Sequence, residues 1–170
     1  MDVLVVVDMQ KDFISGALGT KEACAIVPRV VEKIAQAKKA GKTIVFTRDT
    51  HHENYLQTQE GRNLPVPHCL EHCDGWQIDP VFDTEGAMIF DKPSFGSEAL
   101  VHYLKALDDL SSVEFVGLCT DICVITNVLS TKCALPELPI TVDGSCCAGV
   151  TPESHKNALA AMRMCQIKII

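Results

Sequence analysis

The sequence predicts an α/β protein of three layers, α/β/α, built on a six-stranded, mostly parallel, doubly wound sheet. Short apolar runs, several of them rich in β-branched residues, alternate with longer segments whose apolar residues recur at helical spacing. Such alternation is typical of parallel strands joined by crossover helices. The chain has 170 residues and shows no repeat, linker or low-complexity segment, so we expect one domain spanning residues 1–170.

The expected strands are short apolar runs separated by helical patterns. The first, residues 3–7, reads "VLVVV" and is typical of a strand buried on both faces. Ser97 and Thr151 are expected to cap two of the helices, and Gly41 is expected to end another. The other strands are expected at residues 42–47, 87–90, 113–118, 139–144 and 166–170, with helices at 25–41, 98–110, 123–135 and from 152 onward.

The longest irregular stretch, residues 49–85, lies between the second and third expected strands. Connections of that length without secondary structure are uncommon in compact domains and are usually functional. We therefore expect this stretch to take part in the function.

Charge and composition narrow the range of partners. The net charge is −7, the isoelectric point is about 5.3, and Lys and Arg form no stripe, so nucleic acid is a poor candidate. No apolar run approaches the roughly 20 residues of a membrane span. The N-terminal "MDVLVVVDMQKDF" lacks the basic start of a signal peptide. We expect a soluble, cytoplasmic protein with no nucleic-acid or membrane partner.

Nine cysteines in such a chain point to thiol chemistry, metal binding or catalysis rather than to a disulfide framework. A free cysteine is also a small hydrophobe that packs well in a core. We assign five of the nine to packing: Cys24, Cys133, Cys146, Cys147 and Cys165.

Reactive residues follow four successive strands. Asp8 follows the first, "RDTHH" (48–52) the second, "DKPSFGS" (91–97) the third and "CTDIC" (119–123) the fourth. In open α/β sheets, ligands bind outside the carboxyl ends of the strands. We therefore expect a carboxylate, an Asp/His cluster, a lysine and a thiol to meet at one edge of the sheet.

Cys123 lies where the fourth strand turns into a helix. A helix N-terminus carries partial positive charge and unpaired N–H groups, which lower the pKa of a thiol and can hold an oxyanion. With Asp8 as a base and Lys92 as a charge partner, the thiol becomes a nucleophile with its activators and needs no histidine. The alternative is a buried cysteine at a helix start, beside a solvated Asp–Lys pair at the strand ends.

The motifs "VVVDMQKDF", "TRDTH", "FDKPSFGS" and "GLCTDICV" occur in this order and span most of the chain. With them the sequence resembles the isochorismatase-like cysteine hydrolase superfamily, and within it the nicotinamidase branch. The resemblance implies a catalytic triad of Asp8, Lys92 and Cys123. It also implies a cis peptide bond before Cys119 and an oxyanion hole made by the N–H groups of Cys119 and Cys123.

The resemblance further implies one divalent metal ion in the region 49–85, bound by Asp49, His51, Glu60 and His68. Mixed oxygen and nitrogen ligands suit zinc, our first choice, or manganese or iron, and leave positions open for substrate and water. Glu60 has an alternative role as a solvated loop carboxylate. His52 is expected to lie outside the site.

The segment "PHCLEHC" departs from the family pattern and offers a different metal site. His68, Cys69, His72 and Cys73 could together bind a structural zinc ion. They lie within six consecutive positions, which is tighter than the usual spacing of zinc ligands, so we rank this site below the one implied by the family.

Phe13 and Trp76 are candidates for an aromatic wall around a flat substrate ring, and for Phe13 a plain core role is equally well supported. The resemblance implies an amidase of NAD salvage that hydrolyses nicotinamide to nicotinate and ammonia through a thioester on Cys123, with the ion bound to the pyridine nitrogen. We also expect a homo-oligomer. The alternatives are a cysteine hydrolase of another small amide or carbamoyl compound, an isochorismatase-type hydrolase, and a non-enzymatic zinc or thiol module.

Overall fold

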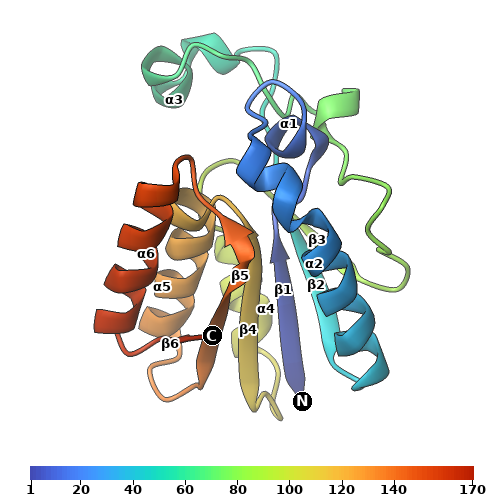
Figure 1. Cartoon of the computed structure of the whole chain (residues 1–170), viewed down its shortest axis with the longest axis vertical. Helices are drawn as coiled ribbons and strands as arrows, with labels where there is room; N and C mark the ends of the chain where they lie inside the picture. The colour runs from blue at the N-terminus through green and yellow to red at the C-terminus, as the bar shows by residue number, and fades with distance from the viewer.

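The computed structural model describes residues 1–170 and contains one six-stranded sheet, in the order β3-β2-β1-β4-β5-β6 (Figure 1). All neighbouring strands are parallel, so the sheet predicted as mostly parallel is parallel throughout. All six predicted strands are present. They are β1 (Asp2–Val7), β2 (Thr43–Asp49), β3 (Met88–Lys92), β4 (Ser112–Leu118), β5 (Ile140–Ala148) and β6 (Lys168–Ile169).

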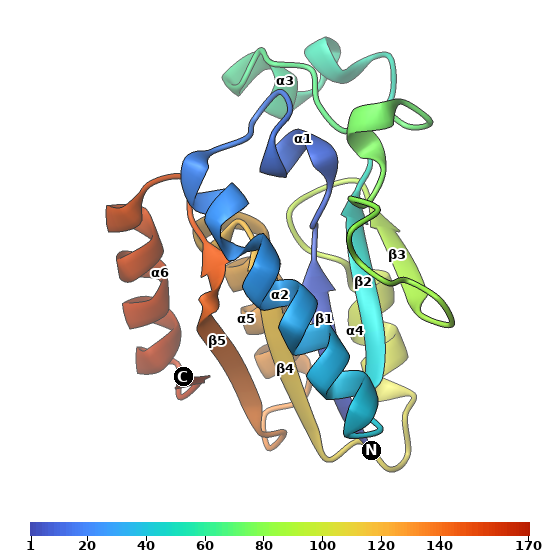
Figure 2. The same ribbon diagram turned by 45° about the vertical axis from the view of Figure 1, so that its right-hand side comes forward.

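Helices cover both faces of the sheet, as predicted (Figures 1 and 2). One helix packs on one face and three pack on the other, and each face has its own hydrophobic core. The helix on the first face is α2 (Lys21–Lys39), and those on the second are α4 (Glu98–Lys105), α5 (Ile125–Ala134) and α6 (Pro152–Met164).

β1 contributes to both cores because successive side chains of a strand point to opposite faces. Leu4 and Val6 join the core beneath α2, whereas Val3, Val5 and Val7 join the core beneath α4, α5 and α6. This double burial explains why β1 is a continuous apolar run, and it fixes the end of β1 at the centre of the sheet.

The helix starts carry the caps that the sequence predicts. Ser97 Oγ accepts a hydrogen bond from Leu100 N (3.1 Å) at the start of α4. Thr151 Oγ1 accepts one from Ser154 N (3.0 Å) at the start of α6, with Pro152 as the first helical residue. Both caps lie on loops that leave the carboxyl edge of the sheet, so they help to fix that edge.

The stretch 49–85, predicted to be functional, folds over the carboxyl ends of the strands (Figure 1). It holds three short helices and lies beside α1 (Lys11–Ile14). The three helices are η1 (Tyr55–Gln57), α3 (Gln59–Asn63) and η2 (Asp74–Trp76).

β1 and β4 approach closely at Gly117, just before the segment that carries the reactive cysteine. The φ angle of Gly117 is 119°, and a Cβ there would lie only 2.2 Å from Val7 O. No residue with a side chain fits at this distance. The glycine therefore allows the end of β4 to lie directly against the end of β1.

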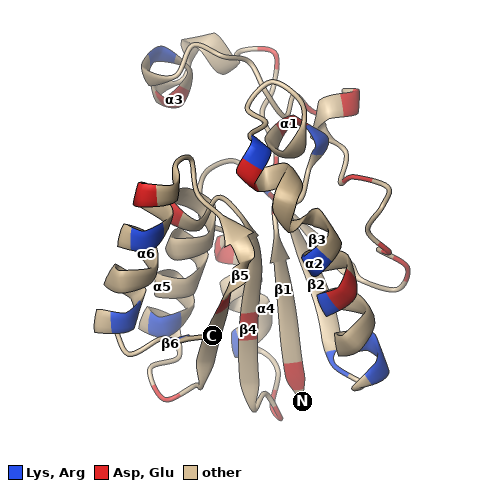
Figure 3. Ribbon diagram, viewed as in Figure 1, with Lys and Arg blue, Asp and Glu red and all other residues tan.

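Lys and Arg are spread over several elements, α2 and α6 among them (Figure 3). None of the helices is both long and apolar enough to span a membrane.

All nine cysteines are free. Cys146 and Cys147 are buried, as their predicted packing role requires. Cys24, Cys133 and Cys165 are exposed, so their assignment to packing is wrong. The three lie on outward faces or at the ends of helices, where the apolar spacing of a helix does not bury every small residue.

Candidate active site

The three predicted catalytic side chains meet at the carboxyl edge of the sheet. Asp8 follows β1, Lys92 ends β3, and Cys123 lies in η3 (Thr120–Val124), which leads from β4 into α5. Lys92 Nζ lies 2.7 Å from Asp8 Oδ2 and 3.5 Å from Cys123 Sγ. All three side chains are buried. A carboxylate, an ammonium and a thiol are thus held together away from water.

Asp8 has a backbone conformation that few residues adopt. Its φ angle is 47°, in the left-handed region, which aspartate tolerates better than most residues. Thr47 Oγ1 donates a hydrogen bond to Asp8 Oδ1 (2.6 Å). Asp8 Oδ2 has the Lys92 ammonium as its one partner, so it retains the capacity to accept a proton from the thiol.

Lys92 is surrounded by acceptors. Its Nζ donates to Ser94 O (2.9 Å) and to Asp49 Oδ1 (3.1 Å), in addition to the ion pair with Asp8. Burial alone would lower the pKa of Lys92, but the neighbouring acidic groups, Asp8 first among them, outweigh burial and hold the pKa well above its ordinary value. The lysine therefore stays charged and compensates the negative charges around it.

The predicted low pKa of Cys123 is wrong. Burial raises the pKa of the thiol well above its ordinary value, and the Asp8 carboxylate raises it further, against the opposing charge of Lys92. Burial also raises the pKa of Asp8, while Lys92 opposes that shift. The structure therefore places a thiol with a raised pKa beside a carboxyl group whose pKa is also raised, rather than a thiol with a lowered pKa.

The peptide bond between Leu118 and Cys119 is cis. Val124 N donates to Cys119 O (3.0 Å), which closes a wide turn around Cys123. The N–H of Cys119 donates to no acceptor in the structure. It is therefore available to an anion bound at this turn.

A group of metal-binding side chains lies beside the catalytic cluster. Asp49, His51 and His68 are buried, and their ligand atoms all lie within 4.8 Å of one another. Asp49 Oδ2 lies 2.9 Å from His51 Nε2 and 3.6 Å from His68 Nε2. Because Asp49 Oδ1 contacts Lys92, this carboxylate joins the two parts of the site.

Hydrogen bonding and charge both fit a cation in this group. His51 Nε2 is buried and makes no aligned hydrogen bond, while His68 Nδ1 contacts Val66 O (2.8 Å) and thereby leaves Nε2 for a ligand bond. Burial would lower the pKa of His51, but Asp49 and Glu60 outweigh it and raise the pKa to about 9. The group thus attracts positive charge, which a divalent ion would supply in place of a proton.

Glu60 lies at the open side of this group. Its Oε1 is 3.5 Å from His51 Nε2 and 3.7 Å from His68 Nε2, and 21% of its side chain is exposed. His52 lies outside, as expected, because its side chain is 66% exposed and contacts Glu71 (3.2 Å). The structure therefore separates the two adjacent histidines and brings Glu60 to the edge of the group.

The alternative zinc site is not assembled. Cys69 is buried, whereas His72 and Cys73 are exposed. His68 instead belongs to the buried group with Asp49, which is the one cluster in the structure with metal-binding geometry.

Of the two predicted ring contacts, the structure brings only Phe13 to the site. Phe13, in α1, lies 5.5 Å from the ring of His68. The ring of Trp76 stacks under the Arg48 guanidinium at 3.4 Å instead. Trp76 Nε1 donates to Thr50 Oγ1 (2.9 Å), and Trp76 belongs to the same apolar cluster as Phe13.

Two buried side chains at the site were not predicted from the sequence. The ring of Tyr55 lies 4.7 Å from that of His51 and 5.1 Å from that of His68, so it packs against both imidazoles. Gln10 Nε2 donates to Asp49 O (2.8 Å), and its Oε1 accepts from Asp49 N (2.7 Å). In the sequence, only the position of Gln10 just after a strand end could have indicated a place at the site. No sequence feature indicated one for Tyr55.

Comparison with known proteins identifies the family. A family model described as the isochorismatase domain matches residues 2–170. The chain belongs to the isochorismatase family. The nicotinamidase of Escherichia coli (strain K12) is 26% identical in an alignment 195 residues long. The alignment covers 95% of this chain and 89% of that protein. The nicotinamidase/pyrazinamidase of Mycobacterium tuberculosis (strain H37Rv) is 25% identical in an alignment 194 residues long. That alignment covers 100% of this chain and 98% of that protein.

A solved structure is similar over the whole chain. The crystal structure of the pyrazinamidase of Pyrococcus horikoshii in complex with zinc has a TM-score of 0.87 and 31% sequence identity. The match covers 99% of this chain and 98% of that one. The likeness therefore includes the sheet, the helices and the region 49–85.

The site of this isochorismatase-family protein opens into a cavity of about 370 Å³. Such a volume is within the range of small-molecule sites. The cavity is bordered by His51 and Glu60 and by the loop that follows Lys92, whereas the side chains of Asp8, Lys92 and Cys123 do not line it. Its lining consists of His51, Thr58, Gln59, Glu60, Asn63, Pro93, Ser94 and Phe95.

Lys92→Met removes the charge that compensates the buried carboxylates. We expect the free energy of unfolding to fall by about 3 kcal/mol at neutral pH, because an unpaired buried charge costs about this much. The loss is expected to shrink at acidic pH. Burial raises the pKa of Asp8 and Lys92 opposes that shift, so without Lys92 the pKa stays raised in the folded state. A group with a raised pKa adds stability at low pH that is lost as pH rises. Urea unfolding at both pH values measures the change.

Lys38→Met is the matched control, since Lys38 pairs with Asp83 at the surface. It is expected to cost no more than about 1 kcal/mol. If Lys92→Met is no more destabilising than this control at neutral pH, the buried charge cluster is not as described.

Proposed function

We propose that this protein is a nicotinamidase, which hydrolyses nicotinamide to nicotinate and ammonia through a thioester on Cys123. The observation that carries the proposal is the buried contact of Lys92 with both Asp8 (2.7 Å) and Cys123 (3.5 Å), beside a metal-binding group. A thiol, a carboxylate and a lysine suffice for nucleophilic attack on an amide. Two relatives named above carry the name nicotinamidase, which supports this choice of amide.

The first half-reaction forms the thioester. Cys123 Sγ attacks the carboxamide carbon, and its proton passes to Asp8 Oδ2. The carboxamide oxygen becomes negative and is stabilised by the N–H groups of Cys119 and Cys123. Asp8 then gives the proton to the amide nitrogen, the C–N bond breaks and ammonia leaves. Lys92 remains charged and stabilises the thiolate and the Asp8 carboxylate in turn.

Water completes the cycle. Asp8 takes one proton from a water molecule, whose oxygen forms a bond to the acyl carbon. The C–S bond then breaks, Asp8 returns the proton to the Cys123 sulfur, and nicotinic acid is released, which becomes nicotinate by giving its proton to ammonia in solution. Each turnover consumes one water and restores the neutral thiol.

Asp49, His51 and His68 would hold a divalent ion, with Glu60 at its open side. Zinc is our choice because the donor set suits it and a similar pyrazinamidase is a zinc complex. When bound, the ion offers the pyridine nitrogen a Lewis-acidic position, which would orient the ring. Phe13 lies next to His68 and offers the ring an apolar surface.

Metal removal tests the role of this group. After treatment with a chelator, we expect nicotinamide hydrolysis to fall to background, while Cys123 remains open to alkylation because the triad is separate from the ion. Benzamide lacks the ring nitrogen, so the metal-containing protein is expected to hydrolyse it much more slowly than nicotinamide. Ammonia release and elemental analysis measure these effects.

His51→Ala and His52→Ala form a matched pair for the same test. The first is expected to lose the ion, since losing a ligand weakens binding strongly, and the second to keep it. A metal-free protein that hydrolyses nicotinamide and benzamide at equal rates would contradict the proposal. It would leave a cysteine amidase that acts on another small amide or carbamoyl compound.

A further inference from the structure

Asn127 is a buried amide on the inner face of α5, one turn after Cys123. Its Nδ2 donates hydrogen bonds to Cys123 O (2.8 Å) and Phe95 O (3.1 Å). Its Oδ1 accepts a hydrogen bond from Ser97 N (2.9 Å). Both donors and the acceptor of the amide are therefore in use, which fixes its orientation.

Two of these three bonds go to the loop that follows the catalytic lysine, residues 93–97. The same loop accepts a hydrogen bond from Lys92 Nζ at Ser94 O (2.9 Å). The loop also passes close to α5, since a Cβ at Gly96 would lie 2.9 Å from Thr126 Cγ2. Hydrogen bonds thus connect Lys92 to the loop 93–97, and the loop to α5.

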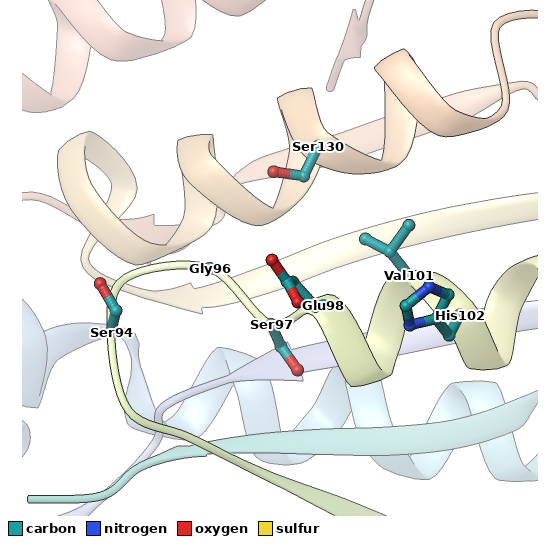
Figure 4. Close-up of a pocket in the computed structure, with 7 residues that line it drawn as sticks. All are labelled: Ser94, Gly96, Ser97, Glu98, Val101, His102 and Ser130. Carbon is teal, nitrogen blue, oxygen red and sulfur yellow. The ribbon is translucent and has the colours of Figure 1, made fainter.

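The outer side of this loop faces a cavity of about 650 Å³ between α4 and α5 (Figure 4). No side chain other than that of Asn127 forms a hydrogen bond between the loop and α5. The cavity is lined mostly by small and polar residues, so it gives the loop little packing support from outside. Its lining consists of Ser94, Gly96, Ser97, Glu98, Val101, His102 and Ser130.

We propose that Asn127 is a positioning residue, which holds the Lys92 ammonium against the Cys123 sulfur by tying the loop 93–97 to the helix that carries the nucleophile. The inference rests on the proposed cysteine hydrolysis, but not on the identity of the amide. Asn127 touches no reacting atom. It acts through Ser94 O, whose position sets where the ammonium lies between the sulfur and the carboxylates.

Loss of this tie is expected to slow the chemical step. The contact between Lys92 Nζ and Cys123 Sγ is already 3.5 Å long, so a small shift of the loop weakens it. Misplacement of a catalytic group by about 1 Å can cost on the order of a hundredfold in rate. Asp49, His51 and His68 lie on other elements, so metal content is expected to change little.

Two substitutions separate the tie from the packing of α5. Asn127→Ala removes all three hydrogen bonds. Asn127→Ser is too short to reach the loop, but its hydroxyl can still bond Cys123 O within the helix, as serine commonly does. We expect both variants to lower kcat by roughly 10- to 100-fold relative to the wild type. Alkylation of Cys123 by iodoacetamide, followed by peptide mass spectrometry, is expected to slow in both.

Thr131→Val is the matched control, since Thr131 lies one turn further along α5, is equally buried and has a hydroxyl without a partner. It is expected to leave kcat and alkylation unchanged. Rates are measured well below the melting temperature of each variant. The substrate is the amide that the wild type hydrolyses fastest, so the result does not depend on that amide being nicotinamide. If Asn127→Ala does not fold, Asn127→Ser decides.

A folded Asn127→Ser protein with wild-type kcat and wild-type alkylation of Cys123 would overturn the proposal. An equal loss in Thr131→Val would do so as well, because it would trace the effect to helix packing. Failure of the wild type to hydrolyse nicotinamide would count against the proposed function alone, since the alkylation rate of Cys123 is read without turnover.

Discussion

Replacing Cys123 by alanine is expected to lower kcat for nicotinamide by at least about a thousandfold while the protein stays folded. The nucleophile is lost, and no other thiol contacts the ion pair of Lys92 with Asp8. The removed sulfur is a single buried atom, so the fold loses little packing. Ammonia release at saturating nicotinamide gives the rate, and a circular dichroism melt confirms the fold.

Cys133→Ala is the matched control because Cys133 lies on α5, follows the same strand and is exposed. It is expected to turn over nicotinamide like the wild type. Retention of as much as about a tenth of the rate in Cys123→Ala would contradict a thioester mechanism, since the residual rate after loss of a nucleophile is far smaller.

Asp8→Asn is expected to reduce kcat by roughly a hundred- to ten-thousandfold, with little change in KM. The amide has nearly the same shape as the carboxyl group, but it cannot take the proton from the Cys123 thiol. Because burial raises the pKa of that thiol, a thiolate does not form without a base. The defect therefore falls on the chemical step. Separate measurements of kcat and KM distinguish it from a defect in binding.

Asp91→Asn controls for the loss of a carboxylate at the end of β3. Asp91 lies next to Lys92 in the sequence, but its carboxylate pairs with Arg48 (2.6 Å) and is exposed. Its substitution is expected to leave kcat nearly unchanged. A normal kcat in Asp8→Asn would place the base elsewhere, and His51 would be the next residue to test.

The sheet and most of the catalytic cluster could be predicted from the sequence because they depend on local patterns. The run at residues 3–7 is apolar throughout since β1 is buried on both faces. The residues after successive parallel strands converge because parallel strands end at the same edge. That rule can be applied without knowing any tertiary contact, and it correctly predicted that Asp8, Lys92 and Cys123 lie together.

What could not be predicted depends on tertiary packing. The thiol of Cys123 sits at a helix start, where its pKa is expected to fall, yet burial next to Asp8 raises it. Trp76 lies in the region above the sheet, but its ring packs on Arg48 and its Nε1 donates to Thr50 Oγ1. Asn127 gave no distinct signal, because α5 contains several other polar residues and the partners of Asn127 lie in a different loop.

The measurement that tests the central claim most directly is ammonia release from nicotinamide by the purified, metal-containing protein. It is compared with benzamide and a small carbamoyl compound, and with the Cys123→Ala variant in parallel. We expect nicotinamide to be hydrolysed fastest and the variant to release no ammonia above background. A folded, metal-containing protein that leaves nicotinamide intact while hydrolysing another of these amides would contradict it.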